Sequence, residues 1–152
     1  MLQEKIDQDL KDAARAQDKQ RLAALRLLKS AVKYREIETS ATLDDAALVG
    51  VVQTLIKQRK DSAAQYTAAN RPELAAQENA EIRILQAYLP SQLTDDELSA
   101  LVKEAVATSG AKGPRDMGGV MKAVGPKIAG RAEGRRVSDA VKAALAALPQ
   151  SG

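Results

Sequence analysis

The sequence contains no cysteine, histidine, phenylalanine or tryptophan among its 152 residues, and only three tyrosines. Without thiol and imidazole groups it has no cysteine nucleophile, no Ser-His dyad and no zinc site of the usual ligands. A metal ion would have to be held by carboxylates and carbonyl oxygens alone. The acidic pairs stand at expected helix starts, where capping and the helix dipole explain them without catalysis. We therefore expect no cofactor, no metal and no catalytic residue.

Long apolar runs are also missing. None approaches the roughly 20 residues that cross a bilayer. The first residues, MLQEKIDQDLK, carry acids and lack the apolar segment of a secretory signal. We expect a cytoplasmic protein with no membrane contact.

The scarcity of aromatic residues leaves Leu, Ile, Val, Ala and Met to build the core, which favours packed helices over a sheet. Apolar residues recur at helical spacing and predict four helices in the first part. The first starts at Leu2 and breaks around residues 17–19, and the second runs from about residue 19 to 38. The third follows the capping segment 42–45 and reaches residue 68, and the fourth opens at Pro72 and is limited by Pro90. In the second of these the apolar set is broad. Leu22, Leu25, Leu28 and Val32 form one stripe and Leu27, Ala31 and Tyr34 another, so we expect that helix to pack on two sides.

A domain boundary is predicted near Pro90, which follows two apolar residues. Thr94 and Glu97 then have the spacing of a capping box at the start of a new helix. The fold class is therefore all-α, with an N-terminal bundle of long helices over residues 1–92 and a C-terminal bundle over residues 93–149. The second bundle is expected to hold three short helices, from residue 94 to about 110, from 114 to 124 and from 133 to 148.

Basic residues and glycines are concentrated in the C-terminal part. The net charge is only +3, but residues 105–137 carry seven basic and two acidic side chains, and residues 110–137 hold seven of the nine glycines. Glycine lets another backbone approach closely, and Lys and Arg attract phosphate. The predicted phosphate contacts are Lys112, Arg115, Lys122, Lys127, Arg131, Arg135 and Arg136.

Two parts of this stretch each have two interpretations. The amides around Gly113 and Pro114 form a phosphate seat at a helix start, or these residues only begin the helix while Asp116 complements its dipole. The loop from Gly125 to Arg136 follows an RNA backbone, or it is a solvated basic loop. No aromatic platform is present for a single-strand reader of the RRM or OB type.

Another basic stretch, residues 57–62 (KQRKDS), lies on a predicted long helix. There we expect Arg59 and Lys60 to meet acids such as Glu78 or Glu81 of the next helix.

Three segments carry a resemblance to a known family. They are RLAALRLLKSAVKYREIE (21–38), IKQRKDSAAQYTAANRPELAAQENAEIRILQAYLPSQL (56–93) and RDMGGVMKAVGPKIAGRAEGRRV (115–137). In this order, over nearly the whole chain, they resemble the YqeY family of GatB/YqeY-domain proteins. The resemblance implies an all-helical protein whose C-terminal domain is similar to the tail of the B subunit of tRNA-dependent amidotransferase. That tail engages tRNA, whereas the chemistry of the enzyme lies in a large region that this chain does not resemble.

The family motifs map onto two groups of positions, which are interpreted mostly as structural. The basic side chains between them are the expected RNA contacts, and Glu133 stands where Asp is commoner in the family. The motif positions are Asp116, Met117, Gly118, Val120 and Met121, followed by Gly130, Arg131, Ala132, Gly134 and Val137.

The leading hypothesis is a non-catalytic accessory protein that binds tRNA or another structured RNA. The alternative is a protein-interaction module whose N-terminal helices dock an aminoacylation or amidation enzyme. A third, a glutamine-dependent amidotransferase subunit, would need a nucleophile or base that the sequence does not offer, so a carbon–nitrogen ligase activity would rest on the resemblance alone. The sequence does not fix the oligomeric state.

Overall fold

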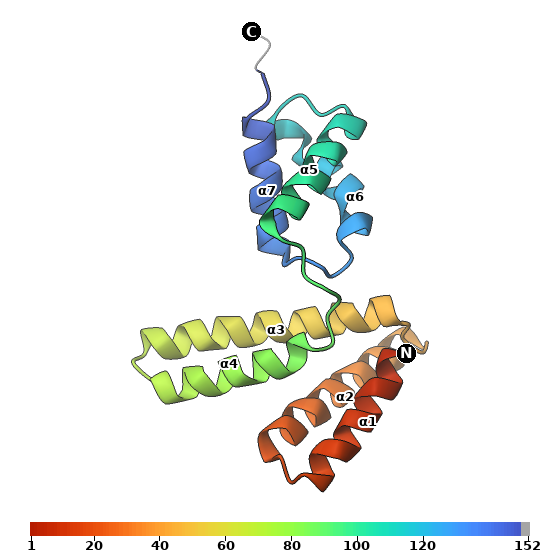
Figure 1. Ribbon diagram of the computed structural model, residues 1–152, viewed down its shortest axis with the longest axis vertical. Coiled ribbons are helices and arrows are strands. Elements are labelled where there is room, and N and C mark those ends of the chain that lie inside the picture. Colours follow the sequence, from red (N-terminus) through yellow and green to blue (C-terminus); the bar gives the residue numbers. More distant parts are fainter. Residues whose placement is uncertain (150–152) are drawn as a thin grey trace. The chain divides into compact units, whose positions relative to one another are not determined.

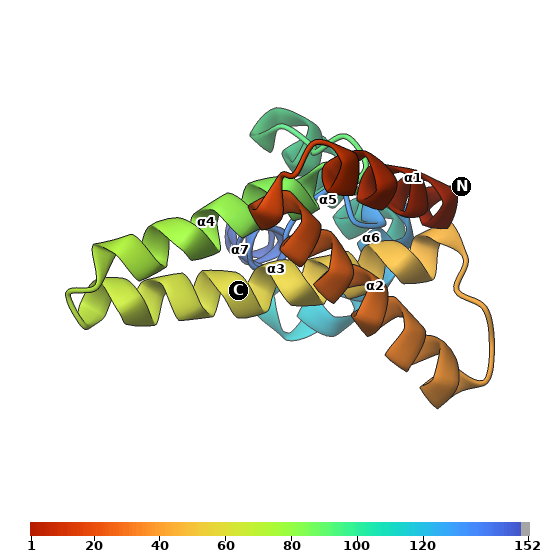
Figure 2. The ribbon, with the colours of Figure 1, turned by 90° about the horizontal axis from the view of Figure 1, so that it is seen from below.

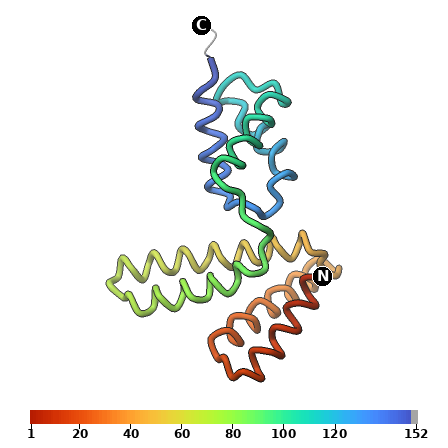
Figure 3. The backbone as a smooth tube through the Cα atoms, in the orientation of Figure 1, coloured from red at the N-terminus to blue at the C-terminus, as the bar shows by residue number. Residues whose placement is uncertain are grey.

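A computed structural model describes residues 1–149, which form seven α-helices, one 3₁₀ turn and no strand. The all-α prediction is confirmed. The chain divides into two compact units, residues 1–89 and the part from residue 90 onward (Figure 1). The backbone trace passes once from the first unit to the second (Figure 3). Each unit has a hydrophobic core of its own.

Unit 1 consists of α1 (Leu2–Arg15), α2 (Lys19–Thr39), α3 (Asp45–Ala68) and α4 (Pro72–Gln86). Consecutive helices form two antiparallel pairs, α1 with α2 and α3 with α4 (Figure 1). Local chemistry fixes the helix starts. The Asp18 and Asp44 side chains accept first-turn N–H groups, and Pro72 occupies the first position of α4. The core of unit 1 is built from the side chains Ile6, Leu25, Leu28, Leu48, Val52, Ile82 and Leu85.

The outer side of α2 differs from the prediction. Leu25, Leu28 and Val32 are buried, whereas Leu27 is 46% and Tyr34 71% exposed. Of the second stripe only Ala31 packs against the core of unit 1, so the expectation that α2 packs on two sides is wrong for Leu27 and Tyr34. Near its C-terminal end α2 contacts the start of α1, where Gln3 Nε2 donates to Glu36 Oε2 at 3.2 Å. The chain then returns to α3 through a loop (Figure 2).

Ion pairs and hydrogen bonds tie the helices of unit 1 together. Arg59 of α3 is buried and donates from Nε to Glu81 Oε2 of α4 at 2.8 Å, so the predicted contact with the next helix is confirmed for this arginine. Its Nη1 also donates to the Leu55 carbonyl at 3.1 Å. After α4, the hydroxyl of buried Tyr88 donates to Asp9 Oδ2 of α1 at 2.5 Å.

Unit 2 consists of α5 (Asp95–Ser109), the 3₁₀ turn η1 (Pro114–Asp116), α6 (Met117–Ile128) and α7 (Gly134–Ala146). The predicted capping box is present, with the Glu97 N–H on Thr94 Oγ1 at 3.1 Å and the Thr94 N–H on Glu97 Oε1 at 3.0 Å. The backbone and side-chain hydrogen bonds from Thr94 lower the pKa of Glu97. The three helices meet on a core of Leu98, Val102, Val120, Val124, Val141 and Leu145.

The boundaries of α6 depart from the prediction. The helix begins at Met117, after η1, and continues through Gly125 and Pro126 to Ile128 instead of ending at residue 124. Pro126 lies in the last turn, where its missing N–H removes only one hydrogen bond and its fixed φ still suits a helix. Ile128 is buried in the core of unit 2, which favours this extra turn.

Candidate nucleic-acid interface

The seven predicted phosphate contacts fall into two groups. Three have partners within unit 2. Lys127 Nζ lies 3.1 Å from Glu104 Oε1, and Arg131 Nε donates to the Ser91 carbonyl at 3.0 Å. Arg136 Nη2 donates to the Leu93 carbonyl at 3.0 Å and to Asp95 Oδ1 at 2.8 Å.

The other four side chains are exposed, and within residues 1–149 they have no hydrogen-bonding or ionic partner. They are Lys112, Arg115, Lys122 and Arg135. The first three come from one continuous stretch, which leads through η1 into the first half of α6. Because no internal carboxylate neutralises them, these cations are available to an external anion.

The loop between α6 and α7 is attached to the segment that enters α5. The Leu93 N–H donates to the Arg131 carbonyl at 2.7 Å, and Gln92 Nε2 donates to the Gly130 carbonyl at 3.2 Å. Gly130 has φ +82°, a conformation that glycine adopts without strain. The loop backbone is thus held by internal hydrogen bonds. Arg135, in the first turn of α7 directly after the loop, is exposed and has no partner among the described residues.

The backbone amides expected to bind a phosphate already donate hydrogen bonds to a side chain of the same protein. Asp116 Oδ2 accepts the N–H of Lys112 at 2.8 Å and that of Gly113 at 3.3 Å. These two groups therefore do not face an anion from solution, and the phosphate-seat interpretation is wrong for them. Asp116 instead closes the turn that leads into α6.

The exposed face of α6 is rich in glycine. Gly118, Gly119 and Gly125 are exposed, and a Cβ added at any of them would meet no atom within 4 Å. Lys122 projects from this same glycine face, given the helical spacing. A helical glycine costs about 1 kcal/mol relative to alanine. Within residues 1–149 no atom would hinder a side chain at these positions.

Four of the other family motif positions contribute to the core of unit 2. Val120 and Val137 are buried, and Met117 and Met121 pack against the core of unit 2. Gly134 begins α7 and has open space around it.

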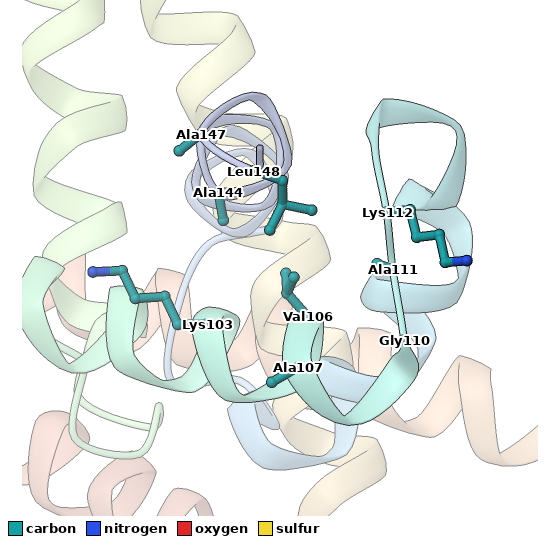
Figure 4. Close-up of a pocket in the computed structure, with 9 residues that line it drawn as sticks. All are labelled: Lys103, Val106, Ala107, Gly110, Ala111, Lys112, Ala144, Ala147 and Leu148. Carbon is teal, nitrogen blue, oxygen red and sulfur yellow. The ribbon is translucent and has the colours of Figure 1, made fainter. Parts of the chain in front are cut away.

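An open groove lies between the C-terminal ends of α5 and α7, with a volume of about 600 Å³. Its walls are mainly apolar, and Lys103 and Lys112 stand on opposite sides of it (Figure 4). Lys103 is exposed and also lacks a partner among the described residues. Sequence reasoning missed Lys103 because it lies outside the basic stretch, on a helix with charges of both signs. The remaining lining residues are Val106, Ala107, Gly110, Ala111, Ala144, Ala147 and Leu148.

Among the described helices, none has the length and apolar character that a membrane crossing needs. The described residues contain no cluster of three or more acidic side chains arranged to hold a metal ion.

Comparison with known proteins identifies the family. Residues 3–145 match the family described as Yqey-like protein. The chain belongs to the YqeY family. It is also similar to proteins named "Altered inheritance of mitochondria protein 41, mitochondrial". The identity is 38% over 87 residues for the protein of Vanderwaltozyma polyspora (57% of this chain, 47% of the relative). It is 39% over 84 residues for that of Kluyveromyces lactis (55% and 45%), and 35% over 91 residues for that of Saccharomyces cerevisiae strain YJM789 (59% and 49%).

These relatives bear on the expected location. The matched segments cover about half the length of each of them. All three are named as mitochondrial proteins, so the comparison contradicts the cytoplasmic location expected from the sequence. That expectation rested on the absence of a signal and of an apolar run, and neither observation distinguishes one aqueous compartment from another.

Proposed function

We propose that this YqeY protein is a non-catalytic accessory protein that binds tRNA or another structured RNA through unit 2. The observation that carries the proposal is the row of exposed, unpartnered cations Lys112, Arg115 and Lys122 beside the glycine face of α6. Phosphate contacts need cations that are free of internal carboxylates, and glycine, which has no side chain, lets a nucleic-acid backbone come close. The resemblance of residues 115–137 to a tRNA-engaging tail supports the same partner.

The mode of binding follows from what the interface lacks. Unit 2 contains no aromatic residue on which a base can stack. Its amides at Lys112 and Gly113 are already occupied by Asp116. The proposed contacts are therefore made to the phosphate backbone and depend on RNA shape more than on base identity. Such binding weakens steeply with salt because counterions are released.

The test is a titration of bulk tRNA with the purified protein at several salt concentrations. The triple variant K112A/R115A/K122A is expected to lose on the order of tenfold to a hundredfold in affinity, and its log-log salt slope is expected to fall by about one for each lost phosphate contact. Arg131 and Arg136 are left intact because their loss would disturb the fold of unit 2.

A matched control is offered by Lys11, Lys57 and Arg83, which are exposed, lack partners among the described residues and lie in unit 1. The variant K11A/K57A/R83A removes the same charge and should bind tRNA nearly as the wild type does. Equal losses in both triple variants would mean that only net charge matters, and no tRNA binding by the wild type at low salt would refute the proposal.

A further inference from the structure

The outer face of α2 exposes large apolar side chains. In residues 1–149 the exposed large apolar residues are Met1, Leu27, Tyr34 and Ile37, and three of these four lie on α2. Leu27 is 46% exposed, and Tyr34 and Ile37 are each 71% exposed. Single exposed apolar residues are common on protein surfaces, but here they line up along one helix.

Their spacing is that of a coiled-coil seam. Leu27 and Tyr34 are seven residues apart, and so are Ala23, Ser30 and Ile37, which are offset from the first pair by three or four residues. These are the a and d positions of a heptad repeat. All five residues are exposed, while the core residues of α2 lie on the other side of the helix. The seam from Ala23 to Ile37 is about 20 Å long at 1.5 Å per residue.

One edge of this seam is basic. Lys19, Arg26 and Lys33 repeat every seven residues beside the a and d positions, at the g position of the heptad. All three are exposed, and none has a partner among the described residues. Elsewhere on α2, Lys29 is paired with Asp7 and Arg35 with Glu38. The cations beside the seam are thus the ones left without an internal carboxylate.

We propose that the seam of α2 docks an amphipathic helix of a partner protein, and that this helix carries apolar residues at its a and d positions and acidic residues opposite Lys19, Arg26 and Lys33. Residues flanking a coiled-coil seam select the partner by charge, and an apolar helix face buries itself against another such face. The site lies in unit 1 and does not depend on the RNA contacts proposed for unit 2.

A second copy of the chain fits this seam less well. In an antiparallel pair the g edges lie side by side, which would place the two basic rows against each other. In a parallel pair each basic row faces the e positions, which are Ala24, Ala31 and Glu38. Only Glu38 is acidic, and it is already paired with Arg35. An RNA backbone would satisfy the cations but offers no apolar ridge for Leu27 and Ile37.

The test uses two designed helical peptides of three heptads with leucine at a and d. One carries glutamate at its e and g positions and the other lysine. The full chain is titrated into each labelled peptide, and binding is measured by fluorescence anisotropy. The glutamate peptide should bind saturably and at least about tenfold more tightly than the lysine peptide, because three exposed charge pairs differ between the two complexes. Equal affinity for both peptides, or no binding of either, would overturn the proposal.

Variants locate the binding. Tyr34→Asp should abolish binding of the glutamate peptide, and the triple variant K19E/R26E/K33E should reverse the preference between the peptides. As a control, Ala64→Asp adds the same negative charge as Tyr34→Asp but at an exposed position of α3, and it should bind the peptide as the wild type does. The variant K112A/R115A/K122A should also bind the peptide as the wild type does. Circular dichroism checks that each variant is folded. Unchanged binding by Tyr34→Asp would overturn the assignment to α2.

Two further outcomes would assign the seam to another occupant. Light scattering is expected to show a monomer, whereas a dimer that Tyr34→Asp dissociates would make the seam a contact between copies of this chain. If K19E/R26E/K33E lost tRNA affinity and kept the peptide preference of the wild type, the basic edge would belong to RNA. Either result would overturn the proposal.

Discussion

Tyr88 is held by charged groups on other helices. It is 3% exposed, its hydroxyl donates to Asp9 Oδ2, and Asp9 also lies 3.7 Å from Arg21 Nη2. Burial raises the pKa of Tyr88, and the hydrogen bond to Asp9 and the negative charge of Asp9 raise it further. The folded chain therefore keeps a phenolic proton that the unfolded chain releases near the ordinary tyrosine pKa of about 10.

This difference predicts a loss of stability at alkaline pH. A raised folded-state pKa contributes stability that is fully present below about pH 10 and is lost as the pH rises toward the folded-state value. Urea unfolding of the wild type should be insensitive to this group at neutral pH and fall off above about pH 10. Tyr88→Phe should cost about 1–2 kcal/mol at neutral pH through the lost hydrogen bond, and its alkaline fall should be shallower. An equally steep fall in both proteins would contradict this role for Tyr88.

Only some contacts between individual side chains can be predicted from the sequence. The pairing of Arg59 with Glu81 was predictable because both lie on helices joined by one short turn, which makes those helices antiparallel neighbours. The contact of Tyr88 with Asp9 spans 79 positions and depends on how the segment after α4 is placed beside α1 in the folded unit. No local pattern encodes such a contact.

At the scale of elements, two adjacent arginines have different surroundings. Arg136 reaches back from α7 to the Leu93 carbonyl and Asp95, whereas Arg135 is exposed and has no partner in the described part of the chain. We expect Arg136→Ala to lower the free energy of unfolding of unit 2 by about 1–2 kcal/mol. Arg135→Ala should change it by less than about 0.5 kcal/mol. Thermal melts of both variants, followed by circular dichroism, measure the difference, and equal stability of the two would refute the anchoring role of Arg136.

Helix starts and stops were largely predictable, because capping depends on neighbours in sequence. Thr94 with Glu97 and Gly110 at the end of α5 are examples. The end of α6 was not predictable, because burial of Ile128 outweighs the break that Gly125 and Pro126 suggest. The candidate interface was predicted only as a basic stretch. Which of its cations have internal partners depends on contacts between α5 and α6, and between α7, the 129–133 loop and the segment around the start of α5.

At the scale of the whole molecule, the two hydrophobic cores share no residue. Each is closed by helices of its own unit, so each unit should unfold as a separate cooperative transition. We expect a fragment of residues 90–152 to be helical and to melt cooperatively by circular dichroism. A fragment that is unfolded in isolation while the full chain is folded would show that unit 2 requires unit 1.

The division of the chain has an optical consequence. All three tyrosines, at positions 34, 66 and 88, belong to unit 1, and no aromatic residue occurs after residue 89. Intrinsic tyrosine fluorescence therefore reports on unit 1 alone, and unit 2 has no aromatic side chain that absorbs or emits in the near ultraviolet. When RNA is added, a change in tyrosine emission would mean that binding affects unit 1. Contact restricted to α6 and α7 would leave the emission unchanged and be visible only through a label or through the RNA itself.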